Sequence, residues 1–121
     1  MTLTNSPNHF LASLSAQDQD LLQPHLKSLR LPQGAALYRT DEIIPYVYFP
    51  ERGIISMIVG VASGQDVEAG VLGRNSVVGA GAALDGPDAL NTAIAQVESA
   101  GMEIAADVLK GLGRKSETLR V

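Results

Sequence analysis

The chain has 121 residues, of which 45% are hydrophobic and 18% charged, which is typical of a single soluble globular domain. It contains no cysteine, which excludes disulfides, thiolate metal sites and a cysteine nucleophile. Its net charge is −4 and its basic residues are scattered, so nucleic-acid binding by this segment alone is disfavoured.

The N-terminal residues 1–9 are polar and include Pro7, so they are predicted to form a mobile leader. They lack the basic start and apolar run of a signal peptide, and no apolar run in the chain reaches the roughly 20 residues that cross a bilayer. We therefore expect a cytoplasmic protein that does not contact a membrane. A helix of about ten residues should begin after Ser15, which precedes Asp18 in the first turn, and should end near Pro24.

Beyond this helix the hydrophobic period changes from helical to alternating. Short β-type runs bounded by glycine and proline occupy residues 29–31, 36–38, 46–49, 54–61, 66–72, 91–97 and 102–104. About eight short strands at this spacing predict an all-β roll or sandwich with small flanking helices. Residues 105–109 predict a brief helix stopped by Gly111 and Gly113, and residues 116–119 resemble the first turn of a further helix.

The stretch 66–84 contains the most unusual pattern in the chain. A strand ends at Gly73, a polar turn of Arg74, Asn75 and Ser76 follows, and the chain returns through Gly79 and Gly81. Glycines one residue apart allow the backbone to approach either a ligand phosphate or another strand. Both interpretations stay open from the sequence.

The order of these segments resembles the effector domain of Crp/Fnr-type bacterial transcription regulators, the cyclic-nucleotide-binding fold. The similarity covers most of the chain from Phe10 onward and rests on LPQGAALYRTDE at 31–42, YVYFPERGIIS at 46–56, DVEAGVLGR at 66–74 and MEIAAD at 102–107. It implies a mainly β, eight-stranded antiparallel β jelly roll at 10–115 with short flanking helices. Residues 116–121 would then begin a truncated dimerisation helix, and the helix-turn-helix DNA-binding domain would be missing.

The resemblance also implies where a ligand would bind. In family members that bind cyclic nucleotides, a glutamate holds the ribose hydroxyl and an arginine neutralises the cyclic phosphate. Alignment on Gly79 puts the glutamate position at Ala80 and the following leucine at Gly81, and alignment on residues 91–93 puts the arginine position at Asn91. Both charged anchors are missing, so classical cyclic AMP binding is disfavoured, since a buried phosphate would lose its charge-assisted pair. We expect a degenerate phosphate-binding cassette and no cofactor.

Eight residues form the candidate ligand pocket: Gly73, Arg74, Val78, Gly79, Ala80, Gly81, Asn91 and Thr92. Arg74 is either a replacement cation at the pocket mouth or a solvated loop arginine that pairs with Glu68. The Thr92 hydroxyl binds either a ligand oxygen or the backbone.

These observations predict a sensory domain of a Crp/Fnr-type regulator that converts ligand occupancy into a shift of the helix starting near Ser116. The expected partners are an unidentified small-molecule effector and, through the missing domain, DNA; a homodimer is left open. The alternative is a stand-alone interaction or assembly module that acts through residues 54–61 or the C-terminal tail. Catalysis has no support, and His9 and His25 are too far apart in sequence to suggest a metal site or a cupin-type enzyme.

Overall fold

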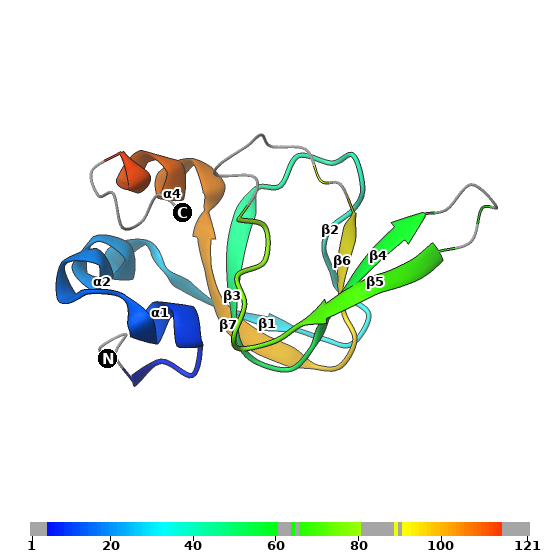
Figure 1. Cartoon of the computed structure of the whole chain (residues 1–121), viewed down its shortest axis with the longest axis horizontal. Helices are drawn as coiled ribbons and strands as arrows, with labels where there is room; N and C mark the ends of the chain where they lie inside the picture. The colour runs from blue at the N-terminus through cyan, green and yellow to red at the C-terminus, as the bar shows by residue number, and fades with distance from the viewer. Residues whose placement is uncertain (1–4, 61–63, 65, 81–88, 90, 115–121) are drawn as a thin grey trace.

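The computed structural model describes residues 5–60, 64, 66–80, 89 and 91–114. Two antiparallel sheets face each other, and the helices lie on one side of them (Figure 1). Within the described residues, no helix combines the length and the apolar character needed to cross a bilayer. The mainly β fold class predicted from the sequence is confirmed.

The strands divide into a three-stranded and a four-stranded sheet. The three-stranded sheet has the order β1 (Lys27–Leu31), β7 (Ser99–Ala105) and β3 (Tyr46–Arg52). The four-stranded sheet has the order β2 (Ala36–Tyr38), β6 (Thr92–Ala95), β4 (Ile55–Gly60) and β5 (Asp66–Leu72). The described residues form seven strands and one isolated antiparallel bridge between Val78 and Tyr48, whereas the resemblance implied eight strands.

The helices are α1 (His9–Ser13), α2 (Ala16–Leu22), the 3₁₀ turn η2 (Gln23–His25) and α4 (Ala106–Gly113). The predicted start of α2 is confirmed, because the Ser15 hydroxyl accepts a hydrogen bond from the Asp18 backbone nitrogen at 3.2 Å. Pro24 ends the α-helical part within η2. Helix α4 continues through Gly111, where the sequence predicted a stop, because its apolar face packs onto β3 and β7.

Helix α1 was not predicted, and it changes the description of the N-terminus. The Asn8 side chain accepts from the Leu11 nitrogen at 3.0 Å, and its amide donates to the carbonyls of Pro50 at 2.7 Å and Ser76 at 3.0 Å. Asn8 is 0% exposed and Ser6 is 7% exposed, so part of the expected mobile leader is packed against the domain. The sequence signal for this helix was Asn8, because asparagine is among the residues preferred at a helix N-cap.

Strand β3 separates two hydrophobic clusters because its side chains alternate between the faces of the sheet. On one face is the helix-side cluster: Leu11, Leu22, Val47, Phe49, Ile104, Ala106 and Leu112. On the other is the roll-interior cluster: Leu31, Tyr38, Ile44, Tyr48, Ile55, Val78, Ala89, Ala93 and Ala95. The helices cover the first cluster and the four-stranded sheet covers the second (Figure 1).

Strand β3 also runs further than predicted, past Pro50 to Arg52. Proline lacks a backbone donor, and this strand tolerates it because β3 is at the edge of its sheet and its register shifts between Pro50 and Arg52. Strand β7 is likewise longer than the predicted 102–104 run, because it lies between two strands and pairs with both. The predicted helix start at 116–119 lies outside the described residues.

Candidate functional site

Gly73 and Arg74, two of the predicted site residues, lie beside the N-terminal helix α1. The Arg74 carbonyl accepts from the His9 nitrogen at 2.8 Å, and the Gly73 carbonyl accepts from the Ser76 nitrogen at 2.9 Å, which closes the predicted turn. The Arg74 side chain is exposed, and Glu68 instead accepts a 2.7 Å hydrogen bond from the Ser56 hydroxyl. The ion pairs formed by the described residues do not include one between Arg74 and Glu68.

Val78 and Gly79 belong to the packing of the roll. Val78 is 0% exposed and exchanges two 2.8 Å backbone hydrogen bonds with Tyr48. Gly79 has a φ of +89°, and a Cβ there would lie 3.2 Å from both Ile44 Cγ2 and the Tyr46 carbonyl oxygen. Backbone conformation and close packing thus account for Gly79. Gly81, the other half of the proposed anion nest, lies outside the described residues.

Thr92 is held at the start of β6 by contacts with the segment that follows β2. Its hydroxyl oxygen accepts from the Thr40 nitrogen at 3.0 Å and lies 3.2 Å from the Thr40 hydroxyl oxygen. Ala89 exchanges backbone hydrogen bonds of 2.8 and 2.9 Å with Glu42 and Asp41, so this part of the chain stays beside the 39–42 turn. Ala80 and Asn91 are both half-buried and uncharged.

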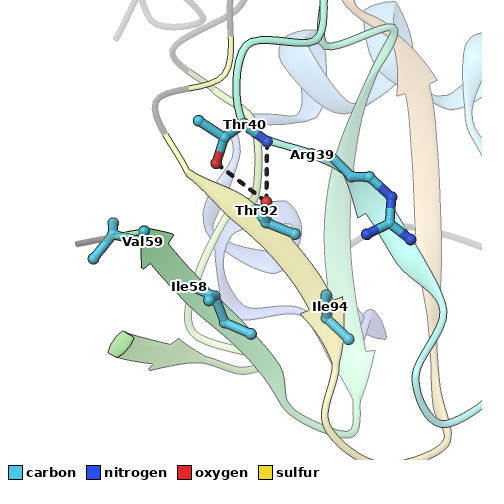
Figure 2. A pocket seen from close by; sticks show the side chains of 7 residues that line it. Arg39, Thr40, Ile58, Val59, Thr92 and Ile94 are labelled. Atoms are coloured by element: carbon cyan, nitrogen blue, oxygen red, sulfur yellow. Dashed lines mark hydrogen bonds between the residues drawn. The ribbon is translucent and has the colours of Figure 1, made fainter. Parts of the chain in front are cut away.

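A cavity of about 300 Å³ lies beside Thr92. Its lining residues are Arg39, Thr40, Ile58, Val59, Gly60, Thr92 and Ile94. Figure 2 shows Thr92 and Ile94 on β6 between Ile58 of β4 and Arg39, which follows β2. Of the residues predicted for the ligand site that the structure describes, Thr92 alone lines this cavity.

The register of the sheet shows which face carries the cavity. Ile58 pairs with Thr92, so these side chains share one face, and Ile94 lies two residues further along β6 on the same face. Ala93 and Ala95 alternate with them and are 0% and 1% exposed in the roll-interior cluster. The cavity is therefore on the outer face of the four-stranded sheet, opposite the roll interior.

Sequence reasoning missed Arg39, Thr40, Ile58 and Ile94 as members of a common site. These residues belong to β4, to β6 and to the segment after β2. They are close together because β6 lies between β2 and β4 in the sheet. No spacing within the sequence carries that information, because the contacts join residues on separate hairpins.

Residues 28–116 match the family model described as the cyclic nucleotide-binding domain. The chain belongs to the cyclic nucleotide-binding domain family. A comparison with curated protein sequences gives no match.

Solved structures similar to this cyclic nucleotide-binding domain include regulator domains from two bacteria. The N-terminal domain of a transcriptional regulator from Streptomyces coelicolor A3(2) has a TM-score of 0.76 at 16% identity, covering 97% of this chain and 80% of that one. The sensor domain of the transcriptional regulator DNR from Pseudomonas aeruginosa has a TM-score of 0.76 at 20% identity, covering 92% and 75%. At these identities the similarity concerns the fold.

A third similar structure comes from a eukaryote. The regulatory subunit of a cAMP-independent protein kinase A from Trypanosoma cruzi, bound to guanosine, has a TM-score of 0.79 at 19% identity. The alignment covers 92% of this chain and 39% of that one, so this chain spans less than half of the length of that regulatory subunit.

The interior of this cyclic nucleotide-binding domain contains two tyrosines and no charged side chain among the described members of its cluster. Tyr48 is 1% exposed, and its hydroxyl has no hydrogen-bond partner within the described part of the chain. Burial, together with the negative charge of Glu51, raises the pKa of Tyr48 to about 12 against a smaller lowering effect of Arg52. Burial also raises the pKa of Tyr38. The roll interior therefore presents neutral phenols, which cannot replace a phosphate-binding cation.

No metal centre is formed by the residues that the structure describes, since no three His, Asp or Glu side chains converge there. His9 and His25 are exposed on α1 and η2.

Proposed function

We propose that this chain is the sensory domain of a cytoplasmic Crp/Fnr-type transcription regulator with a degenerate phosphate-binding cassette. Membership of the cyclic nucleotide-binding domain family supports a regulatory role. Two similar structures are a regulator N-terminal domain and a regulator sensor domain, which supports the same class. DNA would be contacted by a helix-turn-helix domain outside these 121 residues, and the net charge of −4 accords with that division.

The observation that carries the degenerate cassette is the chemistry of Ala80 and Asn91. These are the positions where the resemblance places the ribose-binding glutamate and the phosphate-binding arginine, and neither side chain is charged. We assign no compensating role to Arg74, since the Arg74 carbonyl is hydrogen-bonded to His9 of α1 whereas Thr92 is hydrogen-bonded to Thr40. An unpaired phosphate charge at this place would be costly to bury.

Signal output would pass through α4 to the chain beyond it. Helix α4 contributes Ala106 and Leu112 to the helix-side cluster, which also contains Phe49 of β3 and Leu22 of α2. An effector that favours one arrangement of the roll would shift α4 only through unequal affinity for the two arrangements. This coupling is the physical content of the proposed sensory role.

Isothermal titration calorimetry with cyclic AMP and cyclic GMP tests the proposal. We expect no binding in the micromolar range by the unmodified chain. Micromolar affinity for either nucleotide would contradict the interpretation of Ala80 and Asn91.

A gain-of-function variant gives the complementary test. Ala80→Glu combined with Asn91→Arg should restore both charged anchors and increase cyclic AMP affinity by about tenfold or more, since each charge-assisted hydrogen bond is worth more than a neutral one. Ala80→Gln with Asn91→Gln is the matched control, because it adds similar bulk without charge. An equal response of the two variants would mean that the alignment of the cassette is wrong.

The assembly module remains the second candidate, and one feature of β5 favours it. Val67 and Val71 are 45% and 55% exposed on this strand, which lies at the edge of the four-stranded sheet. Exposed apolar edge strands are sites for pairing with another chain. Sedimentation of the wild type and of Val71→Lys distinguishes the candidates, because an assembly through this edge should dissociate in the variant and a monomeric sensor should sediment unchanged.

A further inference from the structure

We propose that the cavity on the outer face of the four-stranded sheet binds a small amphipathic carboxylate, meaning one carboxylate group on a short hydrocarbon body. The cavity lies between β4 and the segment after β2, with β6 as its floor (Figure 2). It is on the opposite face of the sheet from the roll interior, and Thr92 is the described residue that it shares with the predicted ligand pocket. The decisive test uses Arg39, which is not a residue of the cassette, so its failure is distinguishable from failure of the proposed sensory function.

Arg39 provides the positive charge of the site. Its side chain is exposed, and among the described residues the ion pairs within 4.0 Å are Arg30–Glu98 and Arg52–Glu98, neither of which involves it. The nearby Glu42 carboxylate accepts a 2.8 Å hydrogen bond from the Arg39 backbone nitrogen, which directs that carboxylate to the main chain. A guanidinium without a carboxylate partner matches the planar, two-oxygen geometry of a ligand carboxylate.

Two hydroxyls that line the same cavity supply a further donor. The oxygens of Thr40 and Thr92 are 3.2 Å apart, so one of the two hydroxyls donates to the other. The Thr92 oxygen also accepts from the Thr40 backbone nitrogen. Since each hydroxyl has one proton, the pair retains one proton that is not used between them and can donate to a ligand oxygen. Figure 2 shows this hydroxyl pair at the end of β6.

The rest of the lining is aliphatic and suits a hydrocarbon body. Ile58 and Ile94 line the cavity from neighbouring strands and are half-buried outside the two hydrophobic clusters. The volume of about 300 Å³ is in the range of small-ligand sites, so a short chain or a single ring can displace the water it holds. Release of that water from the isoleucine side chains would favour an apolar group over an additional polar one.

The charge balance selects the number of charges on the ligand. Among the described residues of the cavity lining Arg39 is the single charged side chain, and one guanidinium neutralises one carboxylate. A doubly charged phosphate would leave a charge unpaired against Ile58 and Ile94. The site therefore favours a monocarboxylate over inorganic phosphate.

NMR titration of the complete 121-residue chain with hexanoate tests the site, with hexanamide as the uncharged match and inorganic phosphate as a second anion. We expect hexanoate to shift the amide signals of Arg39, Thr40 and Thr92 and the methyl signals of Ile58 and Ile94. Hexanamide should bind more weakly than hexanoate, with an affinity up to about fivefold lower. This difference corresponds to the free energy of one exposed charge contact. Equal shifts by hexanoate and hexanamide, shifts centred on other residues, or no shift with hexanoate would each overturn the proposal.

Substitutions identify the groups responsible. Arg39→Gln should remove the preference for hexanoate over hexanamide, whereas Arg30→Gln should retain it, because Arg30 is an exposed β1 arginine that does not line the cavity. Thr92→Ser keeps the hydroxyl and should bind hexanoate like the wild type, and Thr92→Val should weaken binding. If Thr92→Val unfolds the chain, the Arg39 and Arg30 variants still decide the proposal. Retention of the preference in Arg39→Gln would overturn it.

Discussion

The two hydrophobic clusters on either side of the three-stranded sheet differ in chemistry. Every buried member of the helix-side cluster has a hydrocarbon side chain, and Phe49 stacks on Phe10 with ring centroids 6.0 Å apart. The roll-interior cluster contains two tyrosines and three alanines, and the Tyr48 hydroxyl has no partner within the described part of the chain. The helix-side cluster buries only apolar groups, which stabilises the fold. The roll-interior cluster also buries a hydroxyl that has no partner among the described residues, which lowers the free energy of unfolding.

This difference shows which part of the domain is specialised. An unpaired buried hydroxyl costs free energy that a phenylalanine at the same position would not. Strand β6 contributes the small side chains of Ala93 and Ala95 to the roll interior, whereas three leucine or isoleucine side chains, Leu11, Leu22 and Ile104, are fully buried in the other cluster. We infer that the helix-side cluster carries most of the stability and that the roll interior tolerates changes of polarity better than changes of volume.

The largest effect is expected for Gly101→Ala on β7, at the boundary of the roll interior. A Cβ at this position would overlap the Phe49 carbonyl oxygen and lie 2.9 Å from the Tyr48 ring. Backbone atoms in a paired strand cannot move away cheaply, so we expect a loss of about 3–5 kcal/mol in the free energy of unfolding, measured by urea denaturation. Gly70→Ala on β5 is the control, because a Cβ there meets nothing within 4 Å. Similar stability of the two variants would contradict the described packing of β3 on β7.

Leu22→Ala tests the helix-side cluster. Leu22 is 0% exposed, so truncation removes buried methyl groups and leaves a cavity, which should cost about 2–4 kcal/mol in urea denaturation. Ile43→Ala is the control for loss of aliphatic surface, since Ile43 is 67% exposed and should change the stability by less than about 0.5 kcal/mol. A Leu22→Ala variant as stable as Ile43→Ala would remove the distinction between the clusters.

Asn8→Ala tests how the N-terminal segment is fixed to the domain. The substitution removes the cap of α1 and the two hydrogen bonds to the carbonyls of Pro50 and Ser76, so thermal unfolding should report a loss of about 1–3 kcal/mol. The exposed turn residue Asn75 provides the control variant Asn75→Ala, which should stay within about 0.5 kcal/mol of the wild type. If both variants unfold like the wild type, residues 5–9 do not contribute to the fold.

The smallest effect at neutral pH is expected for Tyr48→Phe, which removes the unpaired hydroxyl. Stability should stay within about 1 kcal/mol of the wild type or rise, because the lost group makes no hydrogen bond to any residue that the structure describes. The exposed Tyr46, replaced in Tyr46→Phe, is the matched control. A loss of several kcal/mol only in Tyr48→Phe would reveal a hidden partner for this hydroxyl.

The same variant should separate from the wild type at high pH. The pKa of Tyr48 is raised to about 12 in the folded chain from 10.0, so the unfolded state releases its proton first. Wild-type stability is therefore fully present below pH 10.0 and falls as the pH rises towards about 12, by at most about 1.4 kcal/mol per pH unit for this group. Urea midpoints across this range should fall less steeply in Tyr48→Phe, and parallel curves would contradict burial of the phenol.

Much of the fold could be predicted from neighbouring residues in the chain. Alternation of apolar residues gave strands β2 and β5 with their bounds, and Ser15 gave the start of α2. The errors fell where distant contacts outweigh local preference. Pro50 continues β3 because the strand is at a sheet edge, and Asn8 caps a helix because its amide reaches Pro50 and Ser76.

The candidate site could be predicted less well. The chain itself specified that Ala80 and Asn91 lack charge, and that conclusion needs no coordinates. The role of Gly79 required the measured approach of Ile44 and Tyr46, which are more than thirty residues away along the chain. The separation of Arg74 from Thr92 likewise depends on which elements each contacts.

The sequence by itself determined the class of fold, the alternating faces of the strands and the missing charges of the cassette, because each of these is a property of residues close together in the chain. The tertiary structure decided that Arg39, Thr92 and Ile58 share one cavity and that the Tyr48 hydroxyl is buried with no hydrogen-bond partner among the described residues. Those features depend on the order in which strands join a sheet, and that order is fixed by long-range packing between segments whose local patterns look alike.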